Sequence, residues 1–320
     1  MKPLRTFAAA LCALSMTATA VPATAASSQI PWNQVVLRAA PSDGRMTYVK
    51  EEPGIYSRRR LANFAVTFVG PWTVAAKAAF NRAVAVWRIN LNSGVMITVR
   101  ATWAPLGPGV LGSAGPGTFI RDFLNRPIPS TWYPEALANK RRGAQLAPTT
   151  FDIVAQFSSN FTNWHFGVGP APATLFDFQS VVMHELGHGL GFIGAGTVNG
   201  TLGTVRLPPF PGSPALPTVY DRFTRNGLNQ PLINFPNNSV QLGNQLKSNH
   251  VWFRHGAAPA QRFRLFAPAI FDQGSSYSHL NEATYPRGNP NSLMTPQIAP
   301  GETIRVPGLV TKRIFQVMGW

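Results

Sequence analysis

The feature that most constrains this chain is residues 177–194, DFQSVVMHELGHGLGFIG. His184 and His188 are four residues apart, so on a helix both imidazoles lie on one face and can reach a single metal ion. Glu185 lies between them and completes an HExxH pattern. Its place suits it to take a proton from an attacking water and return it to a leaving amine. We therefore predict a helix here that carries a Zn²⁺ site.

The other face of this predicted helix is apolar. Val182, Leu186 and Leu190 share it and should form the buried back of the helix. Gly191 follows as the expected helix stop, where the chain can turn sharply away beneath the metal. A core helix with two purely structural histidines would still need polar partners for both rings, so we favour the metal site.

Two histidines leave the site open, so a third ligand must come from elsewhere, with water in the fourth position of a catalytic zinc. The compact metzincin pattern HExxHxxGxxH is satisfied through Gly191, but Gly194 stands where its last histidine would be. The other candidates are the acidic and histidine residues that follow Glu185. They are Asp221, His250, His255, Asp272, His279, Glu282 and Glu302.

A second motif, SYSHLNEATYPRGNPNSLMTP at residues 276–296, pairs His279 with a downstream Met294. With the HExxH helix it resembles the leishmanolysin-type metzincins and, more loosely, bacterial secreted proteins that carry HELGHGLGF with a later SHLxE and LMTP. In leishmanolysins a long insertion precedes the third zinc histidine, and a methionine turn follows it. The resemblance implies that His279 is the third ligand and that Met294 underlies the site. It also implies a secreted zinc metalloendopeptidase that acts on polypeptides.

Two alternatives remain open. Glu282 could be the third ligand instead, as a downstream glutamate is in gluzincins. That glutamate normally lies on a helix, whereas Pro286, Gly288 and Pro290 interrupt this segment, which favours His279. The chain could also be a non-catalytic, zinc-stabilised surface or binding protein, although such a site would have no use for the base Glu185. Nothing in the sequence indicates a Ca²⁺ site.

Residues 1–25 have a basic start, a short apolar run and small residues before a cleavage point after Ala25. We predict a signal peptide and export to the periplasm or the exterior. No stretch approaches 18 apolar residues, so we expect no transmembrane segment. The only cysteine, Cys12, would leave with the signal, which excludes disulfides and thiolate ligands from the mature chain. This is a departure from the leishmanolysins, which are rich in disulfides.

The formal net charge is +16, which raises the question of nucleic-acid binding. Lys and Arg are scattered and no nucleic-acid motif accompanies them, so we expect no nucleic-acid partner. The charge instead favours adhesion to anionic surfaces or acidic substrates. The oligomeric state is open, with a monomer expected.

The fold class expected from the resemblance is α+β and zincin-like. Residues 26–60 would be an N-terminal arm or short pro-segment, with Arg58, Arg59 and Arg60 as a candidate processing site. Residues 61–194 would form a subdomain with a twisted mixed sheet and the HExxH helix. Residues 195–320 would form a loop-rich, partly helical subdomain that carries the third ligand and ends in a docked helix at IFQVMGW.

Within the first subdomain, Phe64, Val66 and Phe68 alternate as a strand, and Thr73 should cap a helix that runs to about Leu91. Val95, Ile97 and Val99 alternate as a second strand. We interpret LGSAGPG, at residues 111–117, as a glycine-rich turn. By resemblance to zincins, FDIVAQF at residues 151–157 should be the edge strand that borders the cleft and pairs with substrate. His165 is expected to be a loop or packing residue rather than a ligand.

Overall fold

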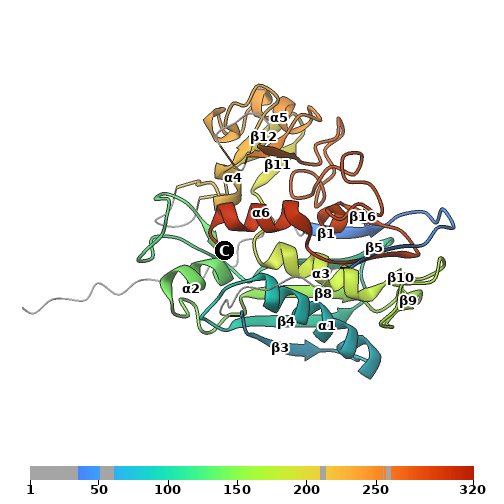
Figure 1. The fold of residues 1–320 in the computed structure, drawn as a ribbon. Helices are drawn as coiled ribbons and strands as arrows, with labels where there is room; N and C mark the ends of the chain where they lie inside the picture. Colours follow the sequence, from blue (N-terminus) through green and yellow to red (C-terminus); the bar gives the residue numbers. More distant parts are fainter. Residues whose placement is uncertain (1–34, 51–60, 210–213, 255, 257–260) are drawn as a thin grey trace, which may run out of the picture.

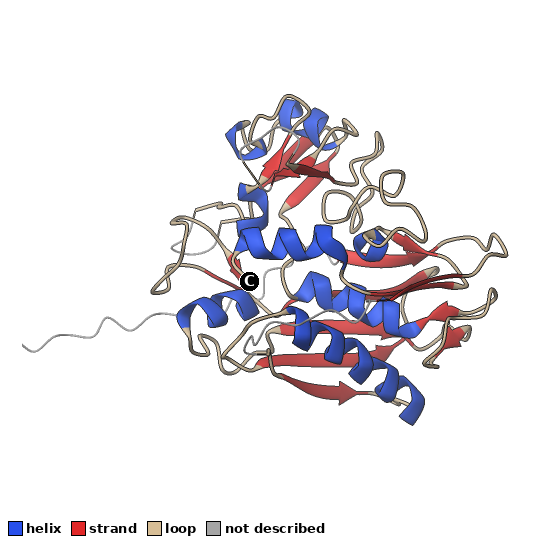
Figure 2. Ribbon diagram, viewed as in Figure 1, coloured by secondary structure: helices blue, strands red, loops and turns tan. Residues whose placement is uncertain are grey.

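The body of the protein is a six-stranded mixed sheet with helices α1 and α3 over one face (Figure 1). The computed structural model describes residues 35–50, 61–209, 214–254, 256 and 261–320. Figure 2 shows that long loops connect the helices and strands. The expected α+β class is confirmed at this level. The predicted signal peptide, residues 26–34 and 51–60 of the predicted arm, and His255 lie outside the described residues.

The sheet has the order β16-β1-β5-β8-β4-β3. Neighbours β3, β4 and β8 are parallel, whereas β5 is antiparallel to both β8 and β1, and β1 is parallel to β16. The strand bounds are β1 Val35–Ala39, β3 Phe64–Val69, β4 Ile97–Ala104, β5 Val110–Pro116, β8 Ile153–Ser158 and β16 Gln297–Ile298. The N-terminal strand β1 is therefore held between a central strand and the C-terminal part of the chain.

Helix α1, Val74–Asn90, confirms the predicted cap and apolar stripe. The Thr73 hydroxyl accepts a hydrogen bond from the Ala76 amide at 3.1 Å, which satisfies one of the free donors at the helix start. Phe80 and Trp87 on the stripe are fully buried, and the Trp87 indole donates to the Met183 carbonyl of α3 at 3.0 Å. The stripe thus fixes α1 against the HExxH helix.

Two strand predictions were wrong. Strand β8 is not an edge, because it lies between β5 and β4, and LGSAGPG is not a turn, because it forms β5. Glycine has a low strand propensity, so the sequence pattern did not indicate a strand at β5. They are needed here because other groups approach closely: a Cβ at Gly112 would lie 2.8 Å from the Glu185 carboxylate, and one at Gly117 only 1.7 Å from the Phe151 carbonyl.

Helix α3, Phe178–Gly189, carries the HExxH pattern. Its N-cap is Asp177, whose carboxylate accepts from the Ser180 amide at 3.0 Å. At the other end Gly191 has φ +118°, and its amide and that of Phe192 donate back into the last turn. This is the Schellman arrangement that a glycine permits, and it confirms the predicted helix stop.

The C-terminal part builds small elements above the sheet and then returns to it (Figure 1). Helix α6, Gly308–Met318, is the predicted terminal helix, and the Trp320 indole after it donates to the Leu190 carbonyl of α3 at 2.9 Å. Several small elements lie between α3 and α6 in the sequence. They are the hairpin β11 Gly196–Asn199 with β12 Leu202–Val205, the sheet of β13 Thr224–Arg225, β14 Trp252–Arg254 and β15 Arg262–Arg264, and helices α4 Val219–Arg222 and α5 Val240–Leu246.

Short elements complete the fold. They are β2 Thr47–Lys50 paired with β17 Glu302–Arg305, β6 Phe119–Ile120 with β7 Tyr133–Pro134, β9 Trp164–His165 with β10 Phe176–Asp177, helix α2 Glu135–Arg142, and the 3₁₀ turns η1 Leu232–Asn234 and η2 Ser292–Met294. Among the residues that the structure describes, no helix is long and apolar enough to cross a membrane. The expected absence of a transmembrane segment agrees with this finding.

Candidate metal centre

Three imidazoles converge at the surface of α3 that faces the C-terminal part of the chain. The Nε2 atom of His188 lies 2.9 Å from that of His184, and the Nε2 atom of His279 lies 3.2 Å from each of the other two. All three side chains are at most 1% exposed. In the described part of the chain, no other group of three or more His, Cys, Asp or Glu side chains lies close enough together to hold a metal ion. The histidines predicted from the sequence are therefore brought together.

Each ring is oriented by a backbone carbonyl at its other nitrogen. Since a carbonyl can only accept, every Nδ1 must carry the proton and every Nε2 must be a free acceptor. The Nδ1 atoms of His184, His188 and His279 lie 2.6, 2.7 and 2.7 Å from the carbonyls of Leu293, Phe192 and Ser275, respectively. Such carbonyls are typical partners of metal-binding histidines, because they fix the tautomer and the direction of the ligand lone pair.

The donor set fits a tetrahedral cation. Three lone pairs that face one another without a proton between them repel, and a cation at their common point relieves this. A zinc ion about 2.05 Å from each nitrogen would hold ideal tetrahedral ligands about 3.3 Å apart, close to the observed spacing. Burial lowers the pKa of His184 to about 4 and the pKa of His188 and His279 well below the ordinary value. The rings are therefore neutral, as metal ligands must be.

The methionine turn η2 joins the two sources of ligands. Its Leu293 carbonyl holds His184, and the next carbonyl, that of Met294, accepts from the Leu280 amide beside His279 at 2.8 Å. The Met294 side chain is fully buried against α3, where a Cβ at Gly187 would come within 2.7 Å of its sulfur. The turn therefore contacts both the helix of His184 and the segment of His279.

Glu185 is completely buried beside strand β5, and neither carboxylate oxygen accepts a hydrogen bond of ordinary geometry, the backbone N–H of Leu37 being at most a weak donor to it. Burial raises its pKa well above the ordinary value, with a smaller opposite effect from the backbone of Leu37. A buried carboxyl group with so little hydrogen bonding is rare in folded proteins and indicates a further polar partner such as water or an ion. Glu185 directly follows His184 in the chain, so helix α3 carries an acidic group that can move a proton beside two of the three imidazoles.

Glu282 does not join the histidine group. It lies near Glu302, and burial followed by that neighbouring carboxylate raises the pKa of Glu282 to about 7. The other predicted candidates in the described chain have different partners. Asp221 accepts from the Ala195 amide at 3.0 Å and the Tyr277 hydroxyl at 2.8 Å, Asp272 pairs with Arg38 at 3.8 Å, Glu302 accepts from the Ala299 amide at 3.1 Å, and His250 is outside the group.

Two further predictions concern residues near the helix. The ring of His165 lies 3.1 Å from the Gly169 carbonyl and is not in the histidine group, in agreement with a packing role. Gly194 is required by packing, because a Cβ there would lie 2.2 Å from the Tyr277 ring and 2.6 Å from Asp221. A histidine could not fit at this position, so the compact metzincin spacing is sterically excluded in this chain.

An ion pair that sequence reasoning missed positions the start of α3. The Arg305 guanidinium lies 2.7 Å from the carboxylate of Asp177, and both side chains are buried. The same guanidinium donates to the carbonyls of Gly167 and Gly169 at 2.9 and 3.0 Å. The N-cap role of Asp177 could be read from its place before the helix. Its partner comes from β17, far along the chain, and no local signal indicates it.

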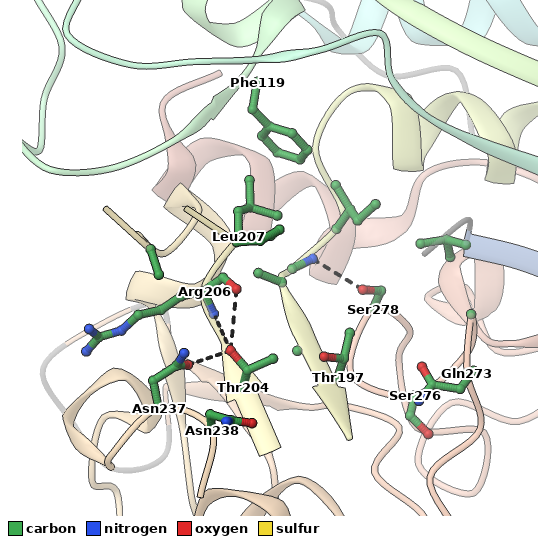
Figure 3. A pocket seen from close by; sticks show the side chains of 18 of the residues that line it. Phe119, Thr197, Thr204, Arg206, Leu207, Asn237, Asn238, Gln273, Ser276 and Ser278 are labelled. Atoms are coloured by element: carbon green, nitrogen blue, oxygen red, sulfur yellow. Dashed lines mark hydrogen bonds between the residues drawn. The ribbon is translucent and has the colours of Figure 1, made fainter. Parts of the chain in front are cut away.

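A cavity of about 360 Å³ is lined by residues from the segments 193–197, 204–209 and 273–278 (Figure 3). Phe119 and Leu207 form an apolar end, and Arg206 and Asn237 lie on the side opposite Ser278. Ser278 immediately precedes His279 in the chain, but none of the three histidines lines the cavity. An apolar pocket with a few polar groups is the usual form of a side-chain or ligand subsite.

Comparisons of the chain with protein-family models, with curated proteins and with solved structures find no match.

Proposed function

We propose that the protein is an exported zinc-dependent metalloendopeptidase of metzincin type. The observation that carries the proposal is the convergence of three buried, neutral imidazoles, with Nε2 atoms 2.9 to 3.2 Å apart, at the helix that also carries the buried carboxyl group of Glu185. The metzincin assignment is supported by the resemblance of the two motifs and by the methionine turn that holds His184 from below.

His184, His188 and His279 would hold the zinc, because three nitrogen ligands leave the fourth tetrahedral position open for chemistry. When bound, the metal supplies a Lewis acid for the scissile carbonyl and activates the attacking water. Glu185 accepts the proton of that water and passes it to the nitrogen of the leaving amine.

A second candidate is a zinc-stabilised protein without turnover. The observation in its favour is that the three histidines and Glu185 are at most 1% exposed, so substrate cannot reach them in this conformation. Metal analysis of the purified full chain, combined with a casein digest, separates the two candidates. About one zinc with digestion of casein, by the intact chain or by the chain cut in the exposed segment 41–46 after β1, supports the peptidase. About one zinc without digestion by either form supports the structural role.

A further inference from the structure

Strand β1 lies in the sheet between β5 and segments from the C-terminal part of the chain. Along one side it pairs antiparallel with β5, and the Ala39 amide donates to the Gly109 carbonyl at 2.8 Å. Along its other side the Val36 amide donates to the Gly274 carbonyl at 2.9 Å, and the Arg38 amide donates to Pro296 at 3.2 Å. An extended segment of the chain is thus bonded to both walls of a groove.

This groove runs directly past the metal centre. In the β1–β5 register Leu37 is opposite Gly112, the residue against which Glu185 packs. On the other wall, Gly274 precedes Ser275, whose carbonyl orients the ligand His279. Leu37 is 2% exposed, and β1 contacts helix α3. The strand therefore covers the buried carboxyl group and contributes to the closure of the site.

The pairing of β1 is what an extended polypeptide ligand would adopt. It adds a strand to β5, which without β1 would expose a free edge beside Glu185. Backbone hydrogen bonds of this kind bind a peptide with little regard to its sequence, and pockets for alternate side chains provide the selectivity. Val35, at the start of β1, lines the 360 Å³ cavity (Figure 3).

From these contacts we propose that the groove between β5 and residues 274 and 296–298 is the polypeptide-binding groove of this site, and that β1 is a built-in occupant that must leave before substrate enters. This inference rests on the proposed peptidase function. The cavity at the Val35 end would receive a substrate side chain larger than valine, since room remains beside Val35 in the occupied state.

The linker after β1 makes release of this strand feasible. Residues 41–46 are exposed, and the chain is then anchored again by β2, which pairs in parallel with β17. A cut in the linker would therefore free β1 and leave β2 in place. The occupant and the rest of the sheet can be separated experimentally without removing any other element.

The experiment uses the full chain with a recognition sequence for a site-specific protease inserted between Pro41 and Ser42. A matched control carries the same insertion between Gly227 and Leu228, in an exposed turn remote in sequence from the groove. Casein digestion is measured before and after each cut. We expect cutting after Pro41 to raise activity by at least about tenfold, since the binding-competent fraction rises, and cutting at the control site to change nothing.

A binding measurement keeps this test independent of turnover. A fluorescent peptide QVVLRAA, the sequence of residues 34–40, is titrated onto the Glu185→Gln form of both proteins, and its anisotropy is recorded. We expect binding only after the cut at Pro41, and tighter binding of QFVLRAA, in which phenylalanine replaces the valine at the position of Val35. The Glu185→Gln protein cut at Pro41 could bind the peptide while the cut protein that keeps Glu185 fails to digest casein. That result would support the proposed groove and overturn the proposed peptidase function.

The full chain with Val36→Pro tests the same point without a cut, because proline removes the amide that donates to Gly274. We expect higher casein digestion with an unchanged cooperative thermal transition. The proposal is overturned if the cut protein loses its cooperative transition, which would make β1 a structural strand. It is also overturned if the peptide binds cut and uncut protein equally, or binds neither.

Discussion

The carbonyl oxygen of Leu293 lies 2.6 Å from Nδ1 of His184. This contact links the HExxH helix to the turn that contains Met294, and the next carbonyl of that turn holds the segment of His279. The backbone of one short turn therefore sets the direction of two ligands that are far apart in the sequence. We therefore expect substitutions in this turn to weaken metal binding by the histidines.

Replacement of Glu185 separates metal binding from turnover. Glu185→Gln keeps the size and burial of the side chain but removes the base, so we expect about one zinc per chain and a loss of casein digestion by about 10²- to 10⁴-fold. Metal analysis measures the zinc, and casein digestion measures the turnover. If the intact chain is inactive, both are measured on protein that has been cut after Pro41 to release β1. A variant as active as the parent would refute the assigned role.

The third ligand can be tested by a pair of substitutions. His279→Ala removes one of the three converging nitrogens, and we expect it to abolish stoichiometric zinc binding. Glu282→Gln changes a side chain outside the histidine group and should retain the zinc. Both variants are measured by metal analysis after dialysis. Zinc lost only with Glu282→Gln would move the site to the gluzincin arrangement.

Part of this site was predictable from local pattern alone. The spacing of His184 and His188 gave the ligand face, and Gly191 gave the end of the helix, because both depend on residues within one turn of each other. The resemblance added His279. Strand β5 was missed because its glycines serve the approach of Glu185, and strand propensity carries no record of such a contact.

The long-range contacts could not be predicted. Arg305 reaches Asp177 from β17, and β1 is inserted between β5 and β16, which belong to opposite parts of the chain. Neither pairing leaves a periodic signal in the sequence, since each depends on how the completed layers meet. Sequence reasoning therefore located the ligands but not the segments that orient and cover them.

Loss of the buried ion pair should destabilise the protein strongly. Asp177→Ala leaves the Arg305 guanidinium buried without its carboxylate and removes the helix cap, so we expect a loss of about 3–5 kcal/mol in the free energy of unfolding. The matched control is Asp122→Asn, since asparagine tolerates the left-handed backbone at this position (φ +59°). The pair of Asp122 with Arg121 is partly exposed and should contribute about 0–1 kcal/mol. Urea titrations compare them. Equal losses in the free energy of unfolding would show that the buried pair stabilises the fold no more than the exposed pair does.

The signal peptide prediction is tested on exported protein. Mass spectrometry should find a mature chain that starts at Ala26, and its activity should be indifferent to dithiothreitol because Cys12 has been removed. Any loss of activity in the reductant should be reversed by added zinc. A chain that retains Met1 after export would contradict the predicted cleavage.

Stability should fall as the pH rises through neutrality, because of Glu135. Burial, opposed in part by the hydrogen bond from Thr150 and reinforced by the charge of Asp152, raises the pKa of Glu135 from 4.5 to about 8. Between these two values the folded state binds a proton that the unfolded state has released. The linkage relation then makes the free energy of unfolding decrease with pH across that range.

Urea titrations at pH 5, 6.5 and 8 measure this dependence in the parent and in Glu135→Gln. Glutamine is neutral at every pH and still offers an oxygen to the Thr150 hydroxyl, so the variant should lose the decrease between pH 5 and 8 that Glu135 causes. The difference between parent and variant should be largest at the alkaline end, where the parent must bury a charge or take up a proton. Parallel pH profiles for the two proteins would mean that Glu135 titrates near its ordinary value and that the space around it admits water.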